Sequence, residues 1–107
     1  MIGFRDDPPA PAGAFTAASD GSHWTFAGEL TFANAAAVLE ASVGMALPAG
    51  GRVDMSGIGS ADSSALAVLL ALKRRAAGER RELRVEGLPP ALAALSRVYG
   101  VEELIAA

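Results

Sequence analysis

The chain has 107 residues, of which 51% are hydrophobic and 20% are charged, and its formal net charge is −3. This length allows one domain with a substantial core. The small negative charge argues against a surface that binds nucleic acid. Because the chain contains no cysteine, disulfides and thiolate metal sites are excluded, and the composition fits a reducing cytoplasm.

Residues 1–13 predict a flexible leader. Three prolines stand at positions 8–11, and proline cannot donate a hydrogen bond to a sheet. The segment also lacks the basic and apolar regions of a signal peptide. The longest apolar run, residues 65–72, is far shorter than the roughly 20 residues that span a membrane. We therefore expect no direct membrane insertion, and one domain over residues 14–107.

The first part of this domain predicts a β-hairpin and then a helix. Short runs at 15–18 and 23–26 flank an Asp-Gly turn. Thr31 is expected to cap a helix over about residues 32–47, which Gly44 interrupts near its end. The apolar residues at helical spacing in this segment are Phe32, Ala35, Ala36, Leu39, Val43 and Ala46.

The second part alternates strands with helices. A strand is expected at 52–55, between Gly50-Gly51 and Ser56-Gly57, and a helix at about 63–77. Alternating residues 82–86 predict a further strand, while Pro89-Pro90 begins a helix that runs to about residue 98. Residues 101–105 fit either a strand or a helical turn. The pattern predicts an α/β fold with a mixed sheet, helices packed against it, and right-handed crossovers.

The junction before residues 63–77 is the best candidate for a functional site. Asp62 and Ser63 stand directly before an apolar run, as helix N-caps do. A hydroxyl there lies beside unpaired backbone N–H groups, which favour a phosphate or a partner's carboxylate. Alternatively, Ser63 is only an N-cap, or the residue after one, and contributes on the order of 1 kcal/mol to the helix.

Three motifs occur in a specific order along the chain. They are Phe26-Ala27-Gly28-Glu29-Leu30-Thr31-Phe32, then Asp54-x-Ser56-Gly57 with Asp62-Ser63-Ser64-Ala65-Leu66, then Leu95-Ser96-Arg97-Val98-Tyr99-Gly100-Val101-Glu102-Glu103-Leu104. Together they resemble the STAS domain family, which includes anti-sigma-factor antagonists and the small STAS subunit of bacterial phospholipid-transport (Mla-type) ABC systems. Ala65 departs from the glycine that many relatives have. The resemblance independently implies a STAS-type mixed sheet with an N-terminal β-hairpin.

This resemblance also implies a function. The first and third motifs are similar to the transport branch, which implies a non-catalytic accessory subunit that binds and regulates the ATPase of a phospholipid-transport ABC complex maintaining membrane lipid asymmetry. Such a subunit would be cytoplasmic and peripheral to the inner membrane through its partner. The alternative is an anti-sigma-factor antagonist, in which an anti-sigma factor kinase phosphorylates the residue matching Ser63. In the transport branch, the resemblance implies that the residue matching Ser63 is a contact residue. Ser64 competes with Ser63 for either role, contact or phosphorylation.

The helix expected at 63–77 is unusually apolar around its circumference. Its core stripe is complete without Leu66 and Leu70, which are apolar as well. These two leucines either bury themselves against the preceding helix or form a docking face beside Ser63, flanked by Lys73 and Arg74. Six of the nine basic residues fall between positions 73 and 84. They form either a solvated helix end or a patch that guides an acidic partner.

Catalysis is not expected. Asp54 and Asp62 have no third ligand or glycine-rich phosphate loop beside them, so neither a metal site nor an acid–base pair is predicted. His23 is the only histidine, and no nucleophile-elbow motif accompanies it. We expect no cofactor, and the chain is interpreted as a protein-binding module.

Overall fold

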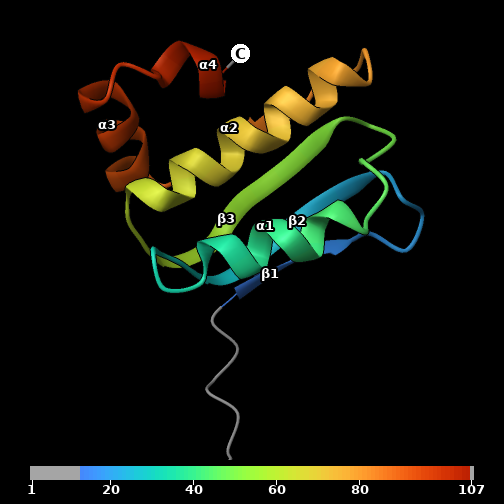
Figure 1. Cartoon of the computed structure of the whole chain (residues 1–107), viewed down its shortest axis with the longest axis horizontal. Coiled ribbons are helices and arrows are strands. Elements are labelled where there is room, and N and C mark those ends of the chain that lie inside the picture. The colour runs from blue at the N-terminus through green and yellow to red at the C-terminus, as the bar shows by residue number, and fades with distance from the viewer. Residues whose placement is uncertain (1–12, 107) are drawn as a thin grey trace, which may run out of the picture.

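The computed structural model describes residues 13–106. The leader predicted at residues 1–13 lies outside the described residues, apart from Gly13. The described elements follow one another as β1 (Gly13–Ala17), β2 (His23–Leu30), α1 (Ala35–Val43), β3 (Arg52–Ala61), α2 (Ser63–Gly78), β4 (Arg84–Glu86), α3 (Pro90–Val98) and α4 (Glu102–Ala106) (Figure 1).

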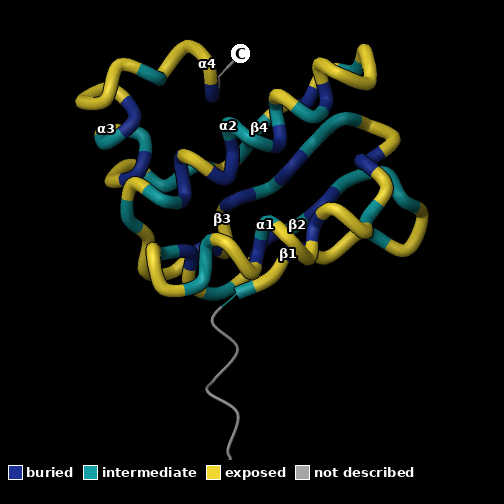
Figure 2. Tube along the Cα trace, in the orientation of Figure 1, coloured by how far each residue is buried: buried dark blue, intermediate teal, exposed yellow. Residues whose placement is uncertain are grey.

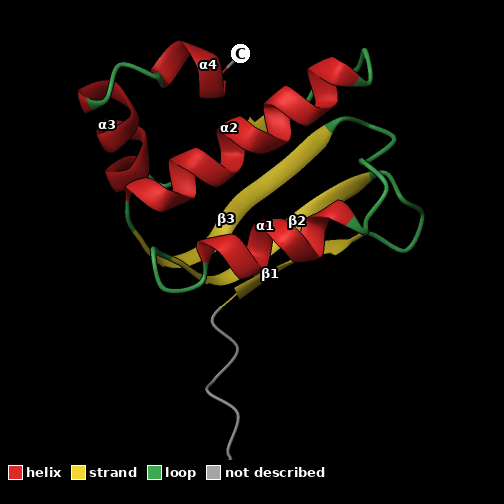
Figure 3. Cartoon of the chain, in the orientation of Figure 1, coloured by secondary structure: helices red, strands yellow, loops and turns green. Residues whose placement is uncertain are grey.

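The four strands form one mixed sheet in the order β1-β2-β3-β4. The hairpin pair β1–β2 is antiparallel, whereas β2–β3 and β3–β4 are parallel. Each parallel pair requires a crossover, and Figure 3 shows α1 and α2 in these two connections. The predicted α/β fold with a mixed sheet and an N-terminal hairpin is confirmed.

Alternation along the two central strands separates the core from solvent. In β2, Trp24 and Phe26 are fully buried, as are Val53 and Met55 in β3, while the residues between them are half-buried. Phe15 of β1 packs edge-on against Phe26, with ring centroids 4.9 Å apart. Burying a side chain of this size contributes roughly 1.5–3 kcal/mol. Figure 2 shows the buried segments concentrated where the strands face α2.

Both central strands are longer than the sequence predicted. The Ser56-Gly57 pair does not end β3, which continues to Ala61 beside residues 27–30 of β2 with register irregularities. A Cβ at Gly57 would lie 2.6 Å from the carbonyl oxygen of Phe26. The glycine therefore permits two strands to approach closely and is not a turn signal. The strand expected at 82–86 is shorter in the structure, where β4 contains only residues 84–86.

Helix α1 is shorter than predicted. It begins at Ala35 because Asn34, not Thr31, is its N-cap residue, and Gly44 is its C-cap. Its buried residues are Val38 and Ser42. Of the apolar residues expected at helical spacing, Ala35 and Leu39 pack against the core, but the others are exposed, namely Phe32, Ala36, Val43 and Ala46. By contrast, α2 and α3 match their predicted bounds within about a residue, and residues 102–106 form a helix rather than a strand.

Candidate partner-binding site

Asp62 joins the start of α2 to the loop that follows β2. Its Oδ1 accepts a hydrogen bond from the Ser64 N–H at 2.8 Å, and its Oδ2 accepts one from the Phe32 N–H at 3.0 Å. The Asp62 N–H in turn donates to the Leu30 carbonyl at 3.4 Å. Asp62 is therefore both the N-cap of α2 and a link between two segments 30 residues apart in sequence.

These hydrogen bonds also determine the charge of the site. The N–H groups of Phe32 and Ser64 stabilise the carboxylate and hold the pKa of Asp62 below its ordinary value of 3.8. The positive end of the α2 dipole favours the same charge. At neutral pH the site therefore contains a fixed negative charge directly before Ser63.

Ser63 and Ser64 occupy different environments. Ser63 is the first residue of α2 and is exposed, whereas Ser64 is half-buried and its N–H is bound by Asp62. Because Asp62 provides the side-chain cap, the hydroxyl of Ser63 is not needed to begin the helix. Of the two serines, Ser63 is the more exposed.

Phe32 lies next to Asp62 in the structure, although the sequence placed it among the apolar residues of the helix expected at 32–47. Its side chain is 87% exposed, and its N–H is the one bound by Asp62. A signal for this placement was present in Asn34, a residue strongly preferred at helix N-caps. With the helix beginning after Asn34, Phe32 lies in the preceding turn.

The predicted docking face on α2 is only partly available. Leu66 is 3% exposed and belongs to the core, so the expectation that it is an exposed docking residue is wrong. The extra apolar surface of α2 has a packing explanation, since this helix contacts α1, α3 and α4. Leu70 is half-buried and Arg74 is exposed. A partner contact by Leu70 or Arg74 stays a prediction.

The basic cluster between residues 73 and 84 is partly used by the fold. Arg75 donates to the carbonyl oxygens of Ser42 and Met45 at 3.1 and 2.7 Å. Arg81 donates to the carbonyls of Leu47 and Pro48. Both guanidinium groups therefore hold the segment between α1 and β3 against the end of α2.

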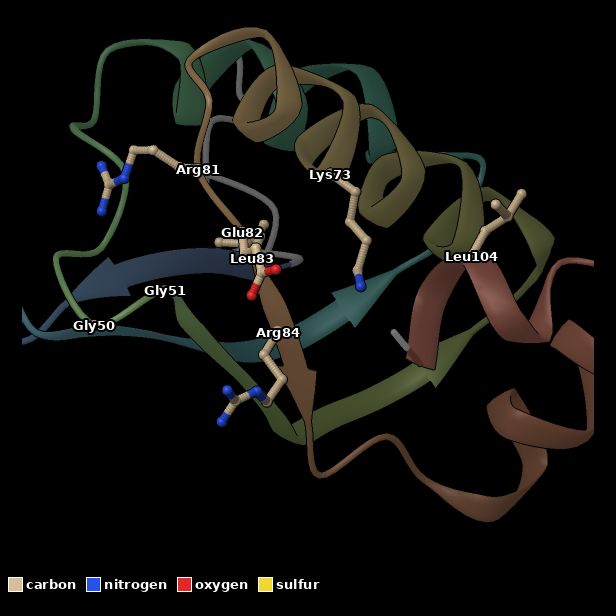
Figure 4. A pocket seen from close by; sticks show the side chains of 8 residues that line it. All are labelled: Gly50, Gly51, Lys73, Arg81, Glu82, Leu83, Arg84 and Leu104. Carbon is tan, nitrogen blue, oxygen red and sulfur yellow. The ribbon is translucent and has the colours of Figure 1, made fainter.

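A hollow of about 480 Å³ adjoins this cluster. Figure 4 shows the side chains of Lys73 and Glu82 extending into the same region, with Arg84 directed away from Lys73. Burial lowers the pKa of Lys73, and the negative charge of Glu82 opposes that effect. Because a carboxylate lies among the cations, the hollow is not a uniformly cationic patch.

The remaining polar candidates have local structural roles. The Asp54 carboxylate accepts the Ser56 N–H at 2.9 Å, and this bond lowers its pKa. His23 Nδ1 lies 3.0 Å from the Ser22 hydroxyl. Among residues 13–106, no three His, Cys, Asp or Glu side chains gather as a metal site would require. Nor does any helix in that range have the length and apolarity to cross a membrane.

Asp62 thus has two exposed neighbours: Ser63 follows it in the chain, and the Phe32 N–H donates to its carboxylate. No curated protein matches the chain. The family model described as "Mlab, STAS domain" matches residues 14–106. STAS domains are generally not enzymes. The match extends over nearly all of the described residues, and the chain therefore belongs to the MlaB-type STAS domain family.

Proposed function

We propose that this protein is a non-catalytic accessory subunit that binds and regulates the ATPase of a phospholipid-transport ABC complex. The observation that supports this most directly is the exposed Ser63 at the start of α2, in a chain matched by the MlaB-type family model. The proposed contact residues are Asp62, Ser63, Ser64, Leu70 and Arg74. In this role the protein is cytoplasmic and reaches the inner membrane through its partner.

The alternative is an anti-sigma-factor antagonist switched by phosphorylation of Ser63. The observation that favours it is the same exposed serine at a helix N-terminus, where the helix dipole stabilises an added phosphate. Asp62 lies next to it and already has a negative charge. Phosphorylation would therefore concentrate about three negative charges at one corner of the domain.

The test is to measure the affinity of the protein for the ATPase encoded with it and, in parallel, for a cognate anti-sigma factor kinase. We expect Ser63→Asp to weaken binding to the true partner, and Ser63→Ala to do so less. Since Asp62 is the N-cap, Ser63→Ala should change the free energy of unfolding by under about 0.5 kcal/mol. Urea denaturation of each variant verifies that the fold is intact.

Ser19 is a matched control, because it is an exposed serine in the hairpin turn, and Ser19→Asp should bind as the parent does. Binding to the ATPase alone supports the transport role, whereas binding to the kinase with phosphate transfer to Ser63 supports the alternative. If both folded Ser63 variants bind as tightly as the parent, Ser63 is not part of the interface.

A further inference from the structure

Phe32 has no role in the packing of this domain. Its side chain is 87% exposed, and Val43, Val98, Tyr99 and Leu104 are the other exposed large apolar residues of the described chain. The fold uses only its backbone N–H, which Asp62 binds and which any residue except proline would supply. Stability therefore gives no reason for an aromatic residue at this position.

The loop that presents Phe32 is held by side-chain hydrogen bonds on both sides. Asn34 accepts the Thr31 N–H and donates to the Glu29 carbonyl, both at 2.9 Å. The Thr31 hydroxyl accepts the Ala33 N–H at 3.2 Å. An exposed aromatic ring on a loop fixed in this way loses little conformational entropy when it is buried by a partner.

Phe32 is also continuous with the residues proposed to bind the partner. The Asp62 carboxylate lies 3.0 Å from the Phe32 nitrogen, and Asp62 immediately precedes Ser63. Leu30 and Ala61 are paired neighbours at the ends of the parallel strands β2 and β3, so the two loops that follow them begin side by side. A protein interface typically buries about 800 Å² of surface on each partner. We therefore expect an interface that contains Ser63 to include Phe32 as well.

We propose that Phe32 is the apolar anchor of the interface centred on Ser63, and that the partner ATPase receives the ring in an apolar pocket beside the group that contacts the serine. This inference rests on the proposed function, because it takes the protein that recognises Ser63 as the occupant. Aromatic residues dominate the energetics of protein interfaces, and a buried ring removes roughly 150–250 Å² from water.

The anchor also explains how a charge at Ser63 acts on binding. When the partner buries the ring of Phe32, it also removes water from the neighbouring position 63. A phosphate on Ser63, or Ser63→Asp, would place an anion there, and burying an anion without a cationic partner is unfavourable. The aromatic ring provides affinity and the neighbouring hydroxyl provides control.

The decisive variant is Phe32→Ala, compared with Tyr99→Ala. Tyr99 is an aromatic residue that is 58% exposed at the end of α3, and it is not part of the proposed interface. We expect Phe32→Ala to weaken binding to the partner ATPase at least about tenfold, with no change in the urea midpoint, and Tyr99→Ala to leave affinity unchanged. Phe32→Leu, which retains an apolar group, should recover part of the lost affinity.

The outcomes separate the two claims. If the parent binds the ATPase and Phe32→Ala binds it equally well, the anchor is overturned while the proposed function stands. The anchor is likewise overturned if Tyr99→Ala loses as much affinity as Phe32→Ala. If the parent binds neither protein, the proposed function fails, and the anchor fails with it.

A second variant tests the positioning role of Asn34. Asn34→Ala removes the bonds to Thr31 and Glu29, so the loop loses its fixed geometry and affinity should fall by a smaller factor. In the Phe32→Ala background, Asn34→Ala should cause little additional loss, because there is no ring left to position. If the double variant instead loses affinity by the product of the two single-variant factors, Asn34 does not act through Phe32.

Discussion

The two ends of α2 satisfy backbone groups with side chains of opposite charge, but with different consequences. At the N-terminal end, the Asp62 carboxylate binds two N–H groups and leaves Ser63 and Phe32 exposed. At the C-terminal end, the guanidinium groups of Arg75 and Arg81 bind four carbonyl oxygens, one in the last turn of α1 and three in the segment between α1 and β3.

The difference shows which charged residues are available to a partner. The sequence left open whether the six basic residues guide an acidic partner, and the structure shows that two of them, Arg75 and Arg81, bind backbone carbonyls. The single acidic residue at the other end looks like an ordinary cap, and its role in the fold is what leaves a hydroxyl and an aromatic ring exposed beside it. A charged side chain is available to a partner only if it does not already bind backbone groups within the domain.

The largest expected effect is a loss of stability on substitution of Leu66, which distinguishes a core residue of α2 from the more exposed Leu70. Leu66→Asp places a charge among core residues at a site that is 3% exposed, so we expect loss of more than about 4 kcal/mol or complete unfolding. Circular dichroism and urea denaturation measure this. Leu70→Asp, at a half-buried position, should be less destabilising and leave a folded protein. A folded Leu66→Asp variant of parental stability would contradict the assignment of this residue to the core.

An intermediate effect is expected at the C-terminal end. Arg75→Ala removes charged hydrogen bonds to two carbonyls and an ion pair with Glu79, so the free energy of unfolding should fall by about 2–3 kcal/mol. Arg74→Ala is the matched control, because Arg74 is the exposed neighbour, and its effect should stay within about 0.5 kcal/mol. Equal stability of the two variants would mean that Arg75 does not hold the loop.

The smallest expected effect is a pH dependence at Asp62. Since the folded state lowers the pKa of this carboxyl below 3.8, its charge stabilises the fold above that value, and the contribution is lost as the pH falls through the folded pKa. Asp62→Asn removes the titration. We expect the parent to exceed this variant in urea midpoint at neutral pH, and the gap to narrow as the pH falls below 3.8. A gap independent of pH would show that the charge contributes nothing.

Local signals in the sequence determined much of this fold. Alternation in the strands, Pro89-Pro90 before α3, and Asp62 before α2 each depend on neighbouring residues only. The two helices were located correctly, and the strands were found but with wrong ends. The Asp-Gly turn between β1 and β2 was also located correctly. Such features are readable because capping and turn formation are decided within a few residues.

Tertiary contacts decided the rest. The extension of β3 past Gly57 depends on the close approach of β2, and the burial of Leu66 depends on the elements packed around α2. The exposure of Phe32 follows from Asn34 and Asp62 acting together across 30 residues. The sequence by itself determined where α2 begins and that a serine follows its cap. Only the folded chain could bring Phe32 near that serine, because the Phe32 N–H donates to Asp62, the residue before the serine and 30 positions away in sequence.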